Sequence, residues 1–88
     1  MITKTVEVTI SVEVTVDETK FTPEFLKEFR EDFYEFDDID DHIEHLAQLT
    51  ARGIMEENDS GQFVEGYGTV EEFGITTNIE NVDVDILD

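Results

Sequence analysis

Cysteine is absent from this 88-residue sequence, which excludes disulfide bonds and thiolate chemistry. No apolar run approaches the roughly 20 residues that a membrane-spanning helix needs. The N-terminal residues lead straight into alternating polar and apolar positions, unlike a signal peptide. We therefore expect a cytoplasmic protein with one domain, residues 1–88, since the chain is too short for two.

Positive charge is nearly as scarce. Five Lys and Arg residues stand against 24 Asp and Glu residues, which gives a formal net charge of −19. A small domain needs a net charge of only roughly 2–8 in magnitude to stay soluble, and further like charge destabilises it by self-repulsion. The negative sign disfavours direct binding to nucleic acid or an anionic membrane, and it predicts a basic DNA-binding protein or complex as the partner.

The charge is also unevenly distributed along the chain. Residues 1–30 hold six acidic and four basic residues, whereas residues 31–88 hold eighteen acidic residues and one base, Arg52. General adaptation to high salt would spread the acidic residues more evenly. Disorder is excluded too, because 39% of the residues are hydrophobic and they recur with regular periods.

Residues 5–16 alternate strictly between polar and apolar side chains, which predicts a long β-strand with one buried and one wet face. The apolar face comprises Val6, Val8, Ile10, Val12, Val14 and Val16. Residues 75–87 predict a second strand, in which Ile79 is out of phase with Val82. This phase shift predicts a β-bulge or a bend around residues 78–81.

Two amphipathic helices are predicted between these strands. Thr22 and Pro23 suit the N-cap and the first position of a helix of about four turns, which ends near Phe36. A second apolar stripe at helical spacing comprises Ile39, Ile43, Leu46, Ala47, Leu49 and Ile54. Gly53 is a typical residue at the end of a helix, so the second helix is expected to stop there. These elements predict an α+β fold: a small antiparallel β-sheet with two α-helices packed on one face, which covers the valines.

Glycines punctuate the remaining segment. Gly66, Tyr67 and Gly68 predict a tight turn that needs positive φ, within a short strand or ordered loop. Residues 69–72 fit a capping box for a single helical turn that Gly74 ends. An alternative role for Tyr67 is that of an exposed aromatic anchor at an interface.

The polar face of the first helix carries a row of carboxylates. Its members lie four, three, four and three residues apart: Glu24, Glu28, Glu31, Glu35 and Asp38. The charge continues onto the second helix with Asp37, Asp40, Asp41 and Glu44. Such a row is a coarse copy of a DNA strand, which carries one charge per roughly 3.4 Å. The alternatives are a solvated face and capping of the second helix by residues 37–41.

No catalytic constellation stands out. The chain lacks the nucleophile, phosphate-loop and dinucleotide motifs, so we expect neither an enzyme nor a cofactor. His42 and His45 share one helix face, but Ile39 stands where a Glu-x-x-His metal motif would begin. We expect these histidines to contact aromatic side chains or a carboxylate, with a metal site as the alternative.

The motif Phe63-Val64-Glu65-Gly66-Tyr67-Gly68, which follows residues 47–53, resembles a small family of uncharacterised phage and mobile-element proteins over residues 25–75. That resemblance implies no particular function. By size, acidity and lack of catalytic residues, the chain is also similar to anti-CRISPR proteins that act as DNA mimics. This second similarity is one of type: it implies a Cas surveillance complex as target and assigns no residue.

We therefore predict an acidic DNA-mimic inhibitor, and by the second resemblance an anti-CRISPR protein that blocks DNA binding by a Cas complex. The residues expected to bind the partner are Glu24, Glu28, Glu31, Glu35, Asp37, Asp38, Asp40, Asp41, Glu44 and Tyr67. The alternative is a phage accessory or assembly protein that acts by docking or oligomerisation, for instance as a homodimer, through a sheet edge and Tyr67.

Overall fold

The helices and strands follow the predicted α+β order. The structure, a computed structural model, describes residues 1–87. Its elements are β1 (Val6–Thr15), the short 3-10 helix η1 (Glu18–Lys20), α1 (Pro23–Asp32), α2 (Ile39–Ala51), β2 (Phe63–Val64), β3 (Gly68–Thr69), α3 (Val70–Phe73) and β4 (Thr76–Ile86). β1 pairs with β4 and β2 with β3, both antiparallel, so the predicted small α+β fold is confirmed.

β1 and β4 form a long two-stranded ribbon with one irregularity. The register shifts between Ser11, which faces Asn81, and Val12, which faces Ile79. The extra residue, Glu80, is the predicted bulge. Because directly facing residues share one side of a ribbon, the bulge brings Ile79 back to the apolar face that carries Val12.

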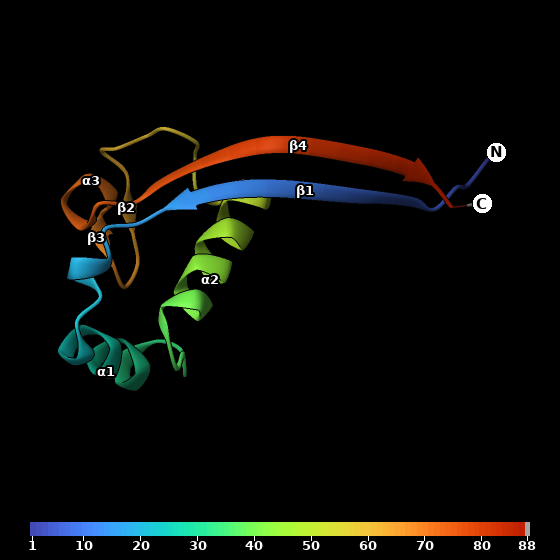
Figure 1. The fold of residues 1–88 in the computed structure, drawn as a ribbon. Coiled ribbons are helices and arrows are strands. Elements are labelled where there is room, and N and C mark those ends of the chain that lie inside the picture. The colour runs from blue at the N-terminus through green and yellow to red at the C-terminus, as the bar shows by residue number, and fades with distance from the viewer. Residues whose placement is uncertain (88) are drawn as a thin grey trace.

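The other elements gather at one end of this ribbon (Figure 1). The opposite end projects alone and carries the N-terminus and the end of β4. The molecule measures 53 × 25 × 19 Å, and its radius of gyration is 15.5 Å, against about 12 Å for a compact chain of this length. We call residues 1–11 and 80–87 the arm, and residues 12–79 the head.

Among the helices of residues 1–87, α2 makes the main contact with the ribbon. There the Thr50 hydroxyl donates a hydrogen bond to the Thr77 hydroxyl at 2.9 Å, and Leu46 is fully buried. α1 lies beyond the N-terminal end of α2, away from the ribbon (Figure 1). The prediction that both helices cover the valine face is therefore wrong. One helix covers the head end of that face, and Val6 and Val8 in the arm remain 45% and 53% exposed.

α1 starts as predicted but ends early. The Thr22 hydroxyl accepts a hydrogen bond from the Phe25 amide at 3.1 Å, which confirms Thr22 as the N-cap. The helix stops at Asp32, about one turn before the expected end at Phe36. Phe36 instead turns back and stacks on Phe29, with ring centroids 5.5 Å apart. The prediction of a four-turn helix is therefore wrong, because this tertiary contact competes with the continued helix.

The glycine signals are confirmed. Gly53 ends α2 with a φ of 74°, Gly66 and Gly68 form the turn between β2 and β3 with φ values of 94° and 83°, and another left-handed glycine ends α3. Two details were wrong. Ile54 lies beyond α2 and is 66% exposed, and the Thr69 side chain makes no capping hydrogen bond to α3.

The head encloses an aromatic core. Its buried hydrophobic members are Phe21, Phe29, Leu46, Met55, Val64, Tyr67, Val70 and Ile75. Gly66 approaches Phe29 so closely that a Cβ atom at this position would clash with the phenyl ring. α1, α2 and the β2–β3 turn are thus held around one cluster, which fixes where the acidic residues of the head lie.

Candidate functional site

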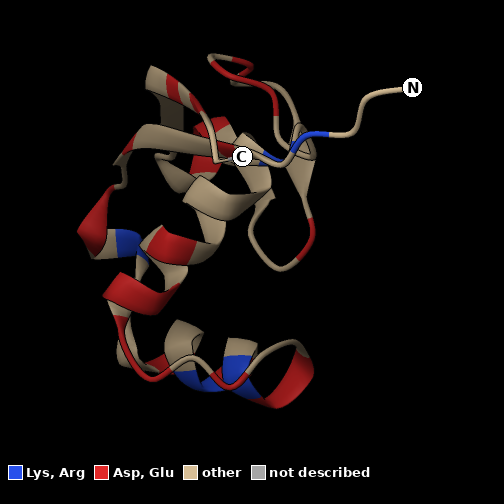
Figure 2. Ribbon diagram, turned by 90° about the vertical axis from the view of Figure 1, so that its right-hand side faces the viewer, with Lys and Arg blue, Asp and Glu red and all other residues tan. Residues whose placement is uncertain are grey.

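The acidic residues of the head form a surface along α1 and the start of α2. We define this acidic belt by the nine carboxylates predicted to bind a partner: Glu24, Glu28, Glu31, Glu35, Asp37, Asp38, Asp40, Asp41 and Glu44. Eight of them are exposed, and Asp41 is half-buried. Residues 24–44 hold ten acidic and two basic residues, a formal net charge of −8. Figure 2 shows acidic residues on both helices, with basic residues in only a few short bands.

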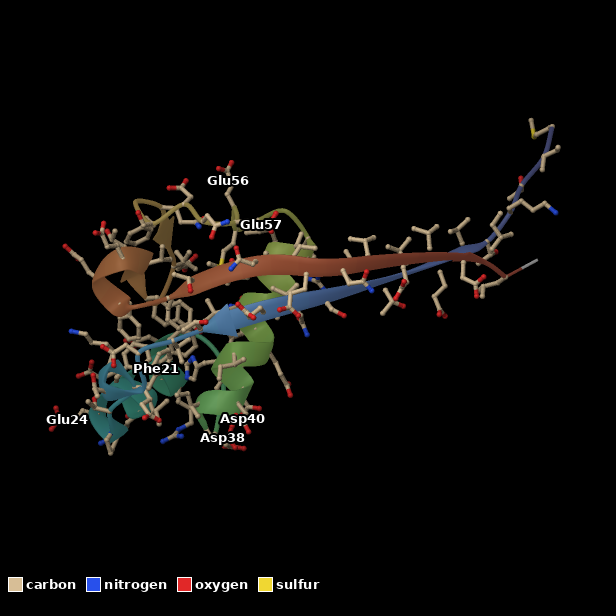
Figure 3. The ribbon with its side chains drawn as sticks, turned by 45° about the horizontal axis from the view of Figure 1, so that its top comes forward. Phe21, Glu24, Asp38, Asp40, Glu56 and Glu57 are labelled. Atoms are coloured by element: carbon tan, nitrogen blue, oxygen red, sulfur yellow. The ribbon has the colours of Figure 1, made fainter. Side chains whose placement is uncertain are left out.

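The belt is not the single helical row that the spacing predicted. α1 carries Glu24, Glu28 and Glu31, whereas Glu35 lies in the connection to α2 and Asp38 is the N-cap of α2. The prediction of one continuous row is therefore wrong, for the same reason that α1 is short. Figure 3 places Glu24 and Asp38 at opposite ends of this side of the head.

Two of the belt aspartates also stabilise local structure. Asp38 Oδ1 accepts a hydrogen bond from the Asp41 amide at 3.1 Å, and Asp41 Oδ2 accepts one from the Asp37 amide at 2.8 Å. Carboxylates at a helix N-terminus satisfy free amides and interact favourably with the helix dipole. The capping role considered for residues 37–41 is therefore confirmed for Asp38 and Asp41. Replacing either residue would disturb α2 as well as the surface charge.

Two cations interrupt the belt. Lys27 and Arg30 line a shallow hollow together with three belt carboxylates, and Arg30 Nη1 donates a hydrogen bond to the Phe36 carbonyl oxygen at 3.3 Å. The stretch that follows, residues 31–44, has eight acidic residues and no base. The strongest negative charge therefore lies from the end of α1 to the first half of α2.

His42 is fully buried at the centre of the aromatic core. Its Nδ1 atom lies 2.8 Å from the Tyr67 hydroxyl oxygen, and the rings of Phe21, Phe29 and Phe36 surround it at centroid distances of 4.6 to 5.4 Å. Burial lowers the pKa of His42 below its ordinary value of 6.5, so the ring is neutral near pH 7. The expected contact with aromatic side chains is confirmed.

Tyr67 is not the exposed anchor that was considered for it. Its side chain is only 6% exposed, because the turn between Gly66 and Gly68 directs it inward onto His42. Burial raises the pKa of the phenol above its ordinary range. The assignment of Tyr67 as a partner-binding residue is therefore wrong, and its role is to complete the core.

An open hollow of about 350 Å³ lies beside the belt, where α1 ends. Phe33, Tyr34 and Phe63 line it and are 41%, 55% and 74% exposed. Asp32 and Glu65 contribute carboxylates, and none of its lining residues is Lys or Arg. Aromatic faces beside carboxylates suit an apolar stem that ends in a cation, such as an Arg or Lys side chain.

This hollow was not predicted from the sequence. The helical periodicity assigned Phe33 to the buried face of a longer helix, so its exposure became visible only once α1 was seen to stop at Asp32. The available signal was Phe63, a large apolar residue next to a turn-rich segment with no apolar neighbour before it. A hollow of this kind depends on how α1, α2 and β2 meet, and local patterns do not specify that.

Searches for a metal site, a membrane-spanning helix and similar proteins each found nothing in the described residues or among known proteins. Across residues 1–87, no three His, Asp or Glu side chains gather closely enough to hold a metal ion. None of the helices in this described part of the chain is long and apolar enough to cross a membrane. No protein-family model, curated protein or solved structure matches the sequence or the fold. The resemblances to phage proteins and to anti-CRISPR proteins therefore remain predictions.

Proposed function

We propose that this chain is an acidic DNA mimic that binds the DNA-binding surface of a basic protein and excludes DNA from it, without catalysis. The observation that supports the proposal most is the exposure of the acidic belt: eight of its nine carboxylates face solvent within a stretch of net charge −8. Proteins that bind DNA place Lys and Arg to meet phosphates. Carboxylates held on two helices compete for the same cations.

The aromatic hollow adds a second element to this proposal. A belt of charge attracts any basic surface, and charge alone raises the rate of association more than it raises affinity. An Arg side chain that enters the hollow would stack on Phe33 or Tyr34 and reach the carboxylate of Asp32. Aromatic and Arg contacts of this type often dominate the binding energy of an interface. The hollow therefore supports selection of one basic partner among many.

The particular target follows from the resemblance of type alone. A Cas surveillance complex holds nucleic acid in a positively charged channel, so it presents the kind of surface that the belt fits. We propose such a complex as the first target to test. An accessory or assembly role remains the second candidate, and the uncovered apolar face of the arm is the observation that favours it.

A competition assay with matched charge changes tests the proposal. The belt variant replaces Glu24, Glu28, Glu31 and Glu44 by Gln; it spares Asp38 and Asp41, which cap α2. The control variant makes the same change at Glu18, Glu56, Glu71 and Glu72, which are exposed residues outside the belt. Figure 3 shows Glu56 on the side of the head opposite Asp38.

We expect the belt variant to displace labelled duplex DNA from the target at least about tenfold less effectively than the parent, because lost charge slows association. The control variant has the same net charge and should compete nearly as well as the parent. An equal loss of competition in both variants would show that total charge matters and the belt does not, and no loss in either would show that neither set of charges matters. If the parent displaces no DNA, this target is not the partner.

A further inference from the structure

The arm presents an apolar face that the rest of residues 1–87 leaves largely uncovered. Val6 faces Ile86, Val8 faces Val84 and Ile10 faces Val82 across the ribbon, so all six side chains lie on one side. Five of them are 45% to 66% exposed, and Ile10 is partly buried. The other side of the arm carries polar residues, among them Glu7 opposite Asp85 and Thr9 opposite Asp83.

This arrangement leaves the arm without the support that a ribbon needs. A two-stranded ribbon is marginally stable in water unless a helix or further strands cover its apolar face. α2 lies against the head end of the ribbon, where Val14 packs on the core, but the ribbon continues past the helix into the arm (Figure 1). Within residues 1–87, most of the apolar face of the arm therefore stays exposed.

We propose that the arm's apolar face binds the same face of a second copy of this chain. The two ribbons pack face to face about a two-fold axis perpendicular to the strands, so that each head lies at the opposite end of the dimer from its partner. Flat faces of Val and Ile from two sheets pack well in this way. The interface is isologous, since the same residues are contributed by both copies.

The exposed apolar area suits a dimer of modest affinity. A fully exposed Val or Ile side chain offers roughly 100–120 Å² of apolar surface, so the six side chains expose on the order of 350 Å² in each chain. Two copies would bury about 700 Å² of apolar surface, which corresponds to a total interface of about 1,100 Å² when apolar atoms supply 65% of it. Specific interfaces begin near 1,000 Å².

The distribution of charge selects both the occupant and its orientation. The head, residues 12–79, carries a formal net charge of −15, from nineteen acidic and four basic residues. The arm has four acidic residues and one Lys, a net charge of −3, and its apolar face has no charged side chain. A basic partner would prefer the head. Two copies can approach without strong repulsion only when the arms overlap and the heads point apart.

Equilibrium sedimentation of the full chain tests this inference with a matched pair of variants. Val8→Lys and Thr9→Lys add the same charge at neighbouring exposed positions on opposite faces of β1. We expect the parent and Thr9→Lys to dimerise at chain concentrations from about 1 µM to 0.5 mM. Val8→Lys should raise the dissociation constant about 100-fold or more, because it buries an unpaired ammonium group in the interface.

Salt gives a second signature. Raising the ionic strength from about 0.05 to 0.5 M screens repulsion between the heads and should strengthen the dimer. The same change weakens the proposed binding of the acidic belt to a basic target, so the two proposals fail independently. If Val8→Lys unfolds, as circular dichroism would show, Val84→Thr keeps the shape and strand propensity and should still weaken the dimer.

Three results would overturn the inference. The first is a parent chain that sediments as a monomer at all of these concentrations and in high salt. The second is equal dimerisation of both Lys variants, which would indicate pairing through a strand edge. The third is loss of the dimer in Thr9→Lys but not in Val8→Lys, which would assign the interface to the polar face.

Discussion

The head and the arm differ in how far they bury their apolar side chains. The head carries a net charge of −15 and encloses an aromatic core around His42, with Phe29 only 2% exposed. The arm carries a net charge of −3 and is purely aliphatic on its apolar face, yet Val84 is 66% exposed. The head thus buries its apolar side chains in its own core and carries charge on its surface, whereas the arm leaves exposed the apolar side chains on which the proposed dimer depends.

Truncation of one large apolar residue in each region should separate them most clearly. Phe29→Ala removes the ring at the centre of the core and should lower the free energy of unfolding by about 3–5 kcal/mol. Val84→Ala in the arm should lower it by less than about 1 kcal/mol at concentrations where the chain is monomeric, since most of this side chain is already in water. Urea unfolding followed by circular dichroism measures both values, and equal losses would contradict the division.

Two glycines of the β2–β3 turn show how closely this turn packs on the core of the head. Both have positive φ, but a Cβ atom at Gly66 would clash with Phe29, whereas Gly68 has open space around it. Gly68→Ala should cost about 1–2 kcal/mol for the left-handed conformation alone. Gly66→Ala should cost at least about 1 kcal/mol more, because the core must also shift. The same unfolding experiment decides this, and a smaller loss for Gly66→Ala would show that the turn does not press on the core.

Acidification should affect the two regions with opposite sign. Burial lowers the folded-state pKa of His42 and of His45, so their contribution to stability is full above about pH 6.5 and is lost as the pH falls through the lowered pKa. In the arm, a hydrogen bond and the like charge of Glu13 raise the pKa of Glu80, so its contribution is present at low pH and is lost as the pH rises through the raised pKa.

We therefore expect the free energy of unfolding to fall between pH 7.5 and pH 5.5, and to fall more steeply in Glu80→Gln, which lacks the opposing contribution. Urea titrations at several pH values measure the slope. NMR titration of the His42 ring should give a pKa below 6.5. A pKa at or above that value would show that the ring is hydrated and that the core is more open than the structure has it.

The smallest expected effect is that of salt on thermal stability. Salt screens the repulsion between carboxylates of the head, so the melting temperature should rise by roughly a few degrees from low to moderate salt. The control is the belt variant described above, which has four fewer negative charges and should respond less. A melting temperature that is flat or falls with salt would show that self-repulsion in the head is already offset by local contacts.

The sequence predicted the features that are determined locally. Strict alternation identified β1, Thr22 and Pro23 identified the start of α1, and the phase shift at Ile79 identified the bulge. The positive φ values at Gly66 and Gly68 followed from the same local reasoning, since glycine is the residue that adopts them without strain.

What the sequence did not predict depends on contacts between distant segments. α1 ends early because Phe36 returns to Phe29, and Tyr67 is buried because it meets His42, which is 25 residues away in sequence. The alternation of Val6 and Val8 shows that one face of β1 is apolar, but it carries no information on what covers that face. The acidic belt shares this limit, since its shape depends on the length of α1.

The most direct test of the central claim is displacement of duplex DNA from a basic target. It compares the parent chain, the belt variant and Val8→Lys at equal concentration. Partner binding is proposed to depend on the charge of the head, and self-association on the arm. The belt variant should therefore lose displacement, while Val8→Lys, a monomer with an intact head, should still displace DNA. Full displacement by the belt variant together with loss of displacement by Val8→Lys would contradict this division and would assign the function to the arm.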